Sequence, residues 1–174
     1  TVLPVINLWK ERMHAGAPPT DDEINETLEL VNYKNISIGN GSISFSQGSM
    51  GITLGGIAKG YAIDRAIEVL KEHHIEHALV NAGGDIRAMG YKTEDEPWKV
   101  ALRNPKNRTE YITVLNLCDM SVATSGNYER YFSEEARASH IIDPKTGYAT
   151  DELLSATIIA ESATDADALA TAVF

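Results

Sequence analysis

The chain has 174 residues and a formal net charge of −10, with 15 Lys and Arg residues against 25 Asp and Glu residues. Hydrophobic residues make up 43% and charged residues 23%, which supports a packed core and rules out disorder over most of the chain. The acidic balance argues against duplex nucleic acid or anionic lipid as the main partner, because both require a basic face. A single cysteine, Cys118, rules out an internal disulfide and a cysteine-based zinc site.

In chain order, the first predicted element is a helix within residues 4–34, where Thr20 is a good N-cap followed by acidic residues. Apolar and polar residues alternate with a period of two on both sides of Gly39-Asn40-Gly41, which predicts a β-hairpin. A short strand is predicted over residues 52–54. The apolar spacing over residues 57–73 then predicts a helix.

Strands dominate beyond this helix. They are predicted over residues 77–81, 86–91, 98–102, 111–117, 121–123 and 153–161, and Thr164 is predicted to cap a final helix. Because the strands come in runs rather than alternating with helices, the predicted fold class is α+β, with mixed or antiparallel sheets and packed helices.

The two ends of the chain suggest a fragment. The chain begins at Thr1 without a methionine, which leaves room for a removed leader, and the apolar run 168–174 stops without a polar cap. Apolar runs nowhere approach the roughly 18 residues of a membrane span. We expect residues 1–174 to form one domain, or at most one compact domain with two lobes. We also expect this domain to be part of a longer protein.

Two glycine-rich segments are candidate ligand sites. Gly55-Gly56 opens a helix whose first turn carries Lys59, so backbone N–H groups and a cation could hold a phosphate; alternatively, this is a tight strand-to-helix turn. The segment Asn81-Ala82-Gly83-Gly84-Asp85 follows a strand, but no helix follows it, so a glycine-rich hairpin is the simpler interpretation.

Further along, Thr124-Ser125-Gly126 follows a strand and offers short hydroxyl donors, unless it merely turns the chain. His140 and Asp143 lie three residues apart before a Pro-x-Thr-Gly turn. A histidine oriented by a carboxylate is a usable general base near neutral pH, although this pair also arises by chance.

Asp167 and Thr171 lie four residues apart, so their side chains share one helical face. A carboxylate and a hydroxyl are hard oxygen ligands that suit Mg²⁺ or Ca²⁺. Acids near a helix start are also ordinary partners of the helix dipole, which accounts for Asp165 but not for Thr171.

Taken together and in this order, these segments resemble the FAD:protein FMN transferase family, the ApbE-like flavin transferases formerly called thiamine biosynthesis lipoproteins. The matching blocks are GGIAKGYAIDRA at 55–66, HALVNAGGDIRAMG at 77–90, ATSGNYERYF at 123–132, SHIIDPKTGYA at 139–149 and ATDADALATAVF at 163–174. The resemblance extends over nearly all of the chain from Gly51 onward, and Leu8-Trp9 resembles an earlier family motif.

The resemblance implies a Mg²⁺-dependent transfer of FMN from FAD to a threonine hydroxyl of an acceptor flavoprotein, with release of AMP. Asp167 and Thr171 match the family's metal ligands, and a backbone carbonyl near Gly56 completes them. His140 matches the proposed base, with Asp143 as its orienting partner. The residues implied to line the FAD site are Gly55, Gly56, Lys59, Asp64, Asn81, Gly83, Gly84, Asp85, Thr124, Ser125 and Gly126.

Family members typically act outside the cytoplasm as membrane-anchored lipoproteins, and no anchor cysteine lies in this chain. Acceptors resemble Asp-x-x-[Ser/Thr]-Gly-Ala-Thr. The segment from Asp143 to Thr150 comes close but carries an extra Tyr148, so it is interpreted as the enzyme's own turn. Two alternatives stay open: hydrolysis of FAD to FMN and AMP, and a protein that binds FAD without catalysis.

Overall fold

The computed structural model describes residues 1–107, 109–127, 131–133, 138–150 and 152–174, and its elements fall into two compact units. Unit 1 comprises residues 1–53 and 127–152, and unit 2 comprises residues 54–126 and 153–174. The α+β class predicted from the sequence is confirmed, since both units combine helices with antiparallel strands. Among the helices in these ranges, none is long and apolar enough to cross a membrane.

Unit 1 opens with two helices, α1 (Leu3–His14) and α2 (Asp21–Leu28). Thr20 caps α2 as predicted, and forms a reciprocal capping box with Glu23. Buried residues from both helices form one core cluster with Ile142: Val5, Trp9 and Ile24. The indole Nε1 of Trp9 donates to the Gly147 carbonyl at 2.8 Å, which joins the start of the chain to the 139–149 segment.

The strands of unit 1 pair locally. After the short 3₁₀ helix η1 (Tyr33–Asn35), β1 (Ile36–Gly39) pairs with β2 (Ser42–Phe45), and β8 (Tyr131–Ser133) pairs with β9 (Ala138–Ser139). The first hairpin turns at Asn40 and Gly41, whose φ angles of 50° and 71° suit an asparagine–glycine turn. This confirms the predicted hairpin.

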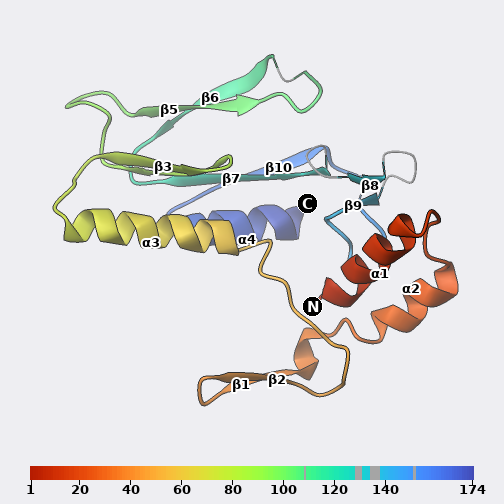
Figure 1. Ribbon diagram of the computed structural model, residues 1–174. Coiled ribbons are helices and arrows are strands. Elements are labelled where there is room, and N and C mark those ends of the chain that lie inside the picture. Colours follow the sequence, from red (N-terminus) through yellow and green to blue (C-terminus); the bar gives the residue numbers. More distant parts are fainter. Residues whose placement is uncertain (108, 128–130, 134–137, 151) are drawn as a thin grey trace. The chain divides into compact units, whose positions relative to one another are not determined.

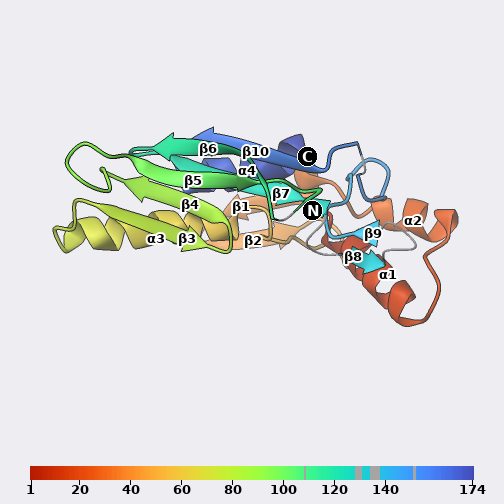
Figure 2. The same cartoon turned by 90° about the horizontal axis from the view of Figure 1, so that it is seen from above.

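Unit 2 is a three-layered arrangement around a four-stranded antiparallel sheet of order β10-β7-β4-β3 (Figure 1). The strands are β3 (Ala78–Ala82), β4 (Asp85–Met89), β7 (Ser121–Gly126) and β10 (Ser155–Ala160). Helices α3 (Ala58–Glu72) and α4 (Ala163–Val173) cover one face. The hairpin of β5 (Trp98–Arg103) and β6 (Tyr111–Leu117) covers the other, as the view from above also shows (Figure 2).

The two faces of the sheet have different cores. On the hairpin side, Ile86, Val122 and Leu117 are buried together with Ala88. On the helix side the core is made of alanines, with Ala123 of β7 against Ala166 and Ala170 of α4. Because alanine side chains are so short, α4 lies close to the sheet, and the polar ends of β7 and α4 are brought together.

Three local predictions were wrong. Residues 52–54 form no strand, and the strand that begins at Ser121 continues to Gly126 instead of ending at Ala123. Helix α4 is capped by Ser162, whose hydroxyl accepts from the Asp165 N–H at 3.0 Å, and not by Thr164. The reason is tertiary, because the Thr164 hydroxyl is hydrogen-bonded to Asp64 of α3 instead.

Candidate functional site

Helices α3 and α4 run antiparallel (Figure 1), and α4 meets two residues of α3 and the glycine that precedes this helix. Three pairs face one another in succession: Gly56 with Thr171, Gly60 with Asp167, and Asp64 with Thr164. Gly60 and Asp64 lie on the same side of α3, since four residues make about one helical turn, and Gly56 lies two residues before the start of this helix. The predicted metal-binding residues therefore lie along a single helix–helix seam.

The approach is closest at Gly60, which is buried in the first turn of α3. A Cβ atom at this position would lie 2.6 Å from the carbonyl carbon of Ala163 and 2.8 Å from Cα of Thr164. Real Cβ atoms do not approach backbone atoms this closely, so only glycine allows the two helices to cross here.

Asp167 acts on α3 from the neighbouring helix. Its side chain is buried, at 4% exposure, and its Oδ2 accepts from the backbone N–H of Gly60 at 2.9 Å. Helix α3 has no side-chain cap of its own at Ile57, so the Asp167 carboxylate supplies a cap from outside. A negative charge at this helix start is also favoured by the helix dipole.

Thr171 lies one helical turn after Asp167 and contacts two further residues of unit 2. The Thr171 hydroxyl is 3.1 Å from the Ser125 hydroxyl of β7. A Cβ on Gly56 would lie 3.0–3.2 Å from three side-chain atoms of Thr171, so the Gly56 backbone is next to that hydroxyl. The structure thus places the Thr171 hydroxyl beside the Gly56 backbone, one helical turn along α4 from the Asp167 carboxylate.

Lys59 and Asp85 form an ion pair beside this group. The Lys59 Nζ lies 2.8 Å from Asp85 Oδ2; the lysine side chain is half-exposed, and the Asp85 side chain is only 3% exposed. Burial raises the pKa of Asp85 above its ordinary value; Lys59 and the backbone N–H of Thr124 lower it, and the charge of Asp167 raises it. Two carboxylates and one cation therefore lie close together.

The segment from Asn81 to Asp85 is a β-hairpin turn. Gly83 and Gly84 both have positive φ, at 65° and 103°, and the Asn81 Oδ1 accepts from the Gly84 N–H at 2.9 Å. Strands β3 and β4 pair directly up to Ala82 and Asp85. The simpler interpretation of this segment, a glycine-rich hairpin, matches the structure, and the turn itself is exposed.

Thr124 and Ser125 lie within β7, and their side chains point to opposite faces of the sheet. Ser125 contacts Thr171 on the helix side, whereas the Thr124 hydroxyl lies 2.9 Å from that of Thr157 in β10. Of this predicted site segment, Ser125 is therefore the residue whose side chain joins the seam, and Thr124 acts on Asp85 through its backbone N–H.

His140 and Asp143 belong to unit 1. His140 is half-buried two residues before Ile142, a member of the unit 1 core. The Asp143 Oδ1 accepts from the Lys145 N–H at 2.8 Å, and its carbonyl accepts from the Gly147 N–H at 2.9 Å. The carboxylate thus closes the Asp-Pro-x-Thr-Gly turn, and its role as orienting partner of His140 stays a prediction. Residues 128–130 of the ATSGNYERYF block lie outside the described residues.

Gly60 and Arg87 were not singled out from the sequence. The signal for Gly60 was present, since a glycine within a predicted helix is costly unless another backbone lies close to it. Arg87 hydrogen-bonds Asp64 from β4, a contact between residues 23 positions apart that no local pattern indicates.

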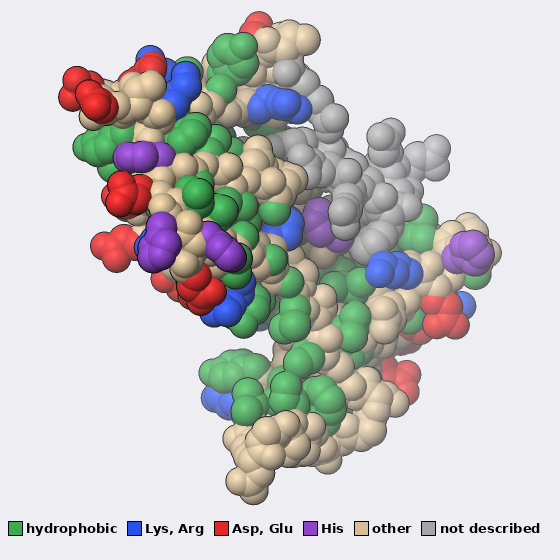
Figure 3. Space-filling view, turned by 60° about the vertical axis from the view of Figure 1, so that its left-hand side comes forward, with side chains coloured by type: hydrophobic (Ala, Val, Ile, Leu, Met, Phe, Trp, Pro, Cys, Tyr) green, Lys and Arg blue, Asp and Glu red, His purple; other side chains and the backbone are tan. Residues whose placement is uncertain are grey.

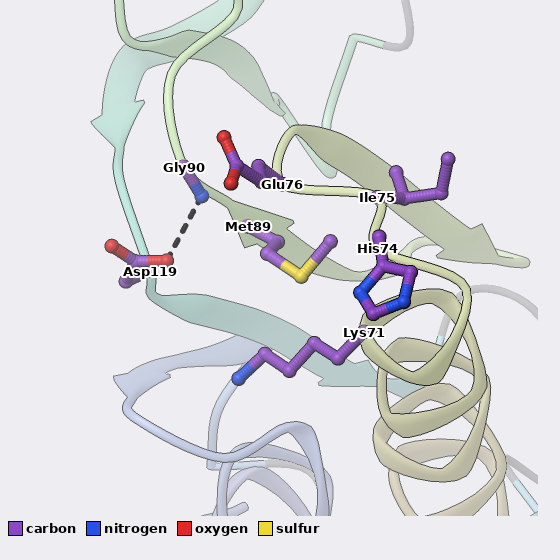
Figure 4. A pocket seen from close by; sticks show the side chains of 7 residues that line it. All are labelled: Lys71, His74, Ile75, Glu76, Met89, Gly90 and Asp119. Carbon is purple, nitrogen blue, oxygen red and sulfur yellow. Dashed lines mark hydrogen bonds between the residues drawn. The ribbon is translucent and has the colours of Figure 1, made fainter.

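A shallow pocket lies at the other end of α3, far along the helix from Gly56 (Figure 4). Its polar lining has mixed charge, with Lys71 and His74 against Glu76 and Asp119. Histidine and charged side chains also gather on the surface over this part of unit 2 (Figure 3). The Asp119 Oδ1 accepts from the Gly90 N–H at 2.9 Å, so this carboxylate serves the local turn.

Comparison with known proteins agrees with the fold. The chain is 38% identical to the ApbE protein of Thermotoga maritima, with a TM-score of 0.85 over 97% of this chain and 57% of that one. A mutant of the flavin transferase ApbE from Vibrio cholerae gives 32% identity and a TM-score of 0.83, covering 98% of this chain and 56% of that one. The fold is therefore that of the ApbE flavin transferases.

The sequence model of the ApbE family matches residues 1–174, and the chain belongs to this family. It is also 35% identical, over 97% of its length, to the FAD:protein FMN transferase of Treponema pallidum, and covers 52% of that protein. The chain spans about half the length of the curated relatives it matches.

Proposed function

We propose that this chain is the FAD- and metal-binding part of an FAD:protein FMN transferase, which transfers FMN from FAD to a threonine hydroxyl of an acceptor flavoprotein. Relatives at 33–35% identity that carry this name support the proposal. The observation that carries it is the meeting of Asp167, Thr171 and Gly56 at the helix seam, since this is the oxygen-donor set that the family resemblance implies.

The residues present fit a magnesium ion. Mg²⁺ prefers oxygen ligands, and the seam offers the Asp167 carboxylate, the Thr171 hydroxyl and backbone carbonyls near Gly56. When bound, Mg²⁺ would neutralise charge on the pyrophosphate of FAD. In the ranges that the structure covers, no cluster of three or more His, Cys, Asp and Glu side chains could hold a metal, so this site would depend on hydroxyl and backbone oxygens.

Charge balance also favours a divalent cation. FAD brings a pyrophosphate to a protein whose net charge is −10. Lys59 is the cation at the start of α3, but its ammonium already pairs with Asp85, and Asp167 adds a second carboxylate nearby. If all three are ionised they sum to one negative charge, so a dication is what would turn this region attractive to phosphate.

The FAD site would be formed mainly from backbone and short polar side chains. The N–H groups around Gly55 and Gly56 at the start of α3 suit a phosphate group. Lys59 and Ser125 would contribute polar side-chain contacts, and the exposed turn at Gly83-Gly84 lets a ligand approach the backbone closely.

The proposed reaction is one substitution at phosphorus. The threonine oxygen of the acceptor forms a bond to the FMN phosphorus, and the bond from that phosphorus to the oxygen of the AMP phosphate breaks. The hydroxyl proton passes to His140, which Asp143 would orient, and AMP leaves with the bridging oxygen. Positioning and charge neutralisation supply most of the catalysis in such transfers.

Mass spectrometry tests the reaction. The protein is incubated with FAD, Mg²⁺ and a peptide carrying an Asp-x-x-Thr-Gly-Ala-Thr sequence, and the expected product is peptide plus one FMN, with an equal amount of AMP. Release of free FMN with unlabelled peptide would contradict the transferase proposal and identify a hydrolase. FAD recovered intact would indicate a binding protein.

A further inference from the structure

The start of α4 is held by a single carboxylate from α3. The Asp64 Oδ1 accepts from the Ala163 N–H at 2.9 Å, and Oδ2 accepts from the Thr164 N–H at 2.9 Å and from the Thr164 hydroxyl at 2.6 Å. Arg87 of β4 donates to Oδ1 from the side of the sheet. Both carboxylate oxygens are therefore used, each by two donors.

The contact made by Asp64 is the reciprocal of the contact made by Asp167. Asp64 of α3 accepts from N–H groups in the first turn of α4, and Asp167 of α4 accepts from an N–H in the first turn of α3. Each helix thus receives a cap from the other, and Gly60 allows the close crossing between the two caps. Helix ends need such partners because their first N–H groups have none within the helix.

The hydrogen bonds around Asp64 favour the ionised form of its carboxyl group. Burial raises its pKa, but the hydrogen bonds from the Thr164 hydroxyl, the backbone N–H groups of Ala163 and Thr164, and Arg87 lower it further, so the pKa lies below its ordinary value. The side chain is 13% exposed. A carboxylate with both oxygens occupied in this way is placed to fix the helix.

The position of α4 decides where its oxygen ligands lie. With a rise of about 1.5 Å per residue, Asp167 follows Thr164 by about 4.5 Å along the axis, and Thr171 follows it by about 10.5 Å. A helix moves largely as a rigid rod, so a shift or tilt at Thr164 is carried to both residues. Groups that orient metal ligands from outside typically change metal affinity by about 10- to 100-fold when removed.

We propose that Asp64 is a positioning residue: it fixes the first turn of α4 to α3 and β4, and so places Asp167 and Thr171 for the metal. Asp64 then has its partners in α4 and β4, which differs from the FAD-lining role that the resemblance implied. The inference rests on the proposed metal site, because it concerns the ligands of that site.

Metal affinity tests this role directly, with Mn²⁺ as an electron-paramagnetic probe in place of Mg²⁺. The variant Asp64→Asn keeps the side-chain shape but turns one acceptor into a donor that faces N–H groups. We expect the Mn²⁺ dissociation constant to rise about 10-fold or more. The variant Thr164→Val removes only the hydroxyl contact and should have a smaller effect.

The matched control is Asp165→Asn. It removes an exposed carboxylate from the same first turn of α4 without touching α3, and should leave the dissociation constant within about twofold of the wild-type value. All titrations are made where circular dichroism shows the variant to be folded. A variant that merely unfolds part of the population would lower the number of sites and leave the dissociation constant unchanged.

The outcomes separate the two proposals. If the wild-type chain binds no Mn²⁺, the proposed metal site is wrong and the positioning role falls with it. If the wild-type chain binds Mn²⁺ and Asp64→Asn binds it equally well, the positioning role is overturned while the metal site stands. Loss of sites at an unchanged dissociation constant would also overturn the positioning role.

Discussion

Substitution of Gly60 by alanine tests the helix seam through the sign of its effect. In an ordinary helix, alanine in place of glycine stabilises the protein by about 0.5–1 kcal/mol, because glycine loses more backbone entropy on folding. At Gly60 the new Cβ would lie 2.6 Å from the Ala163 carbonyl carbon. Helix propensity and packing therefore predict opposite changes.

The packing effect should prevail. Overpacking against backbone costs about 1–3 kcal/mol and occasionally more. Moving the helices apart also weakens the hydrogen bond from the Gly60 N–H to the Asp167 carboxylate, and a bond to a charged group contributes about 1.5–3 kcal/mol. After subtracting the propensity gain, we expect a net loss of about 2 kcal/mol, which corresponds to a melting temperature lower by about 4–8 °C.

The assay follows unit 2 by the fluorescence of Trp98, with Trp9 replaced by phenylalanine in every variant so that unit 1 gives no tryptophan signal. Urea unfolding gives the free energy of each variant. Gly48→Ala is the control, because a Cβ there meets nothing within 4 Å. If Gly60→Ala is as stable as its parent or more stable, the close crossing of α3 and α4 is wrong.

The remaining predictions concern the metal ligands and the two buried carboxylates. In Gly56→Ala, the three atoms nearest the new Cβ all belong to the Thr171 side chain, so this variant should fold normally but bind Mn²⁺ more weakly; unchanged affinity would show that Gly56 is not part of the metal site. Lys59→Met leaves the Asp85 carboxylate without its cation and should cost about 1–2 kcal/mol in urea unfolding, which a second change, Asp85→Asn, should largely restore; additive losses would contradict the pair. Because the pKa of Asp64 is lowered on folding, its stabilisation is complete at neutral pH and is lost as the pH falls below the ordinary value of 3.8. The stability difference between wild type and Asp64→Asn should therefore shrink in acid, and a difference that stays constant down to about pH 2 would refute this.

Local patterns in the sequence were enough for most of the fold. The turn at Asn40-Gly41 and the N-cap at Thr20 depend on neighbouring residues only, and the sequence predicts both. Residues 52–54 show the limit of this reasoning. Their β-branched residues suit a strand, but a strand also needs a partner, and β propensity depends strongly on that context.

The site was predictable as a set of residues but not as an arrangement. Asp167 and Thr171 share a helical face by spacing alone. By contrast, the hydrogen bonds that Thr164 donates to Asp64 and that Gly60 donates to Asp167 join positions 100 and 107 residues apart, and no local sequence pattern indicates them. For the same reason, the sequence favoured Thr164 as an N-cap, whereas tertiary contact with Asp64 leaves that role to Ser162.

The measurement that tests the central claim most directly is the mass of a threonine-containing acceptor after incubation with FAD, compared between Asp167→Ala and Asp165→Ala. The two variants remove carboxylates two residues apart in α4, one buried in the seam and one exposed. We predict that Asp165→Ala adds one FMN to the acceptor in the presence of Mg²⁺, and that Asp167→Ala, although folded, adds none. Equal Mg²⁺-dependent labelling by both variants would contradict a metal site at the meeting of α3 and α4.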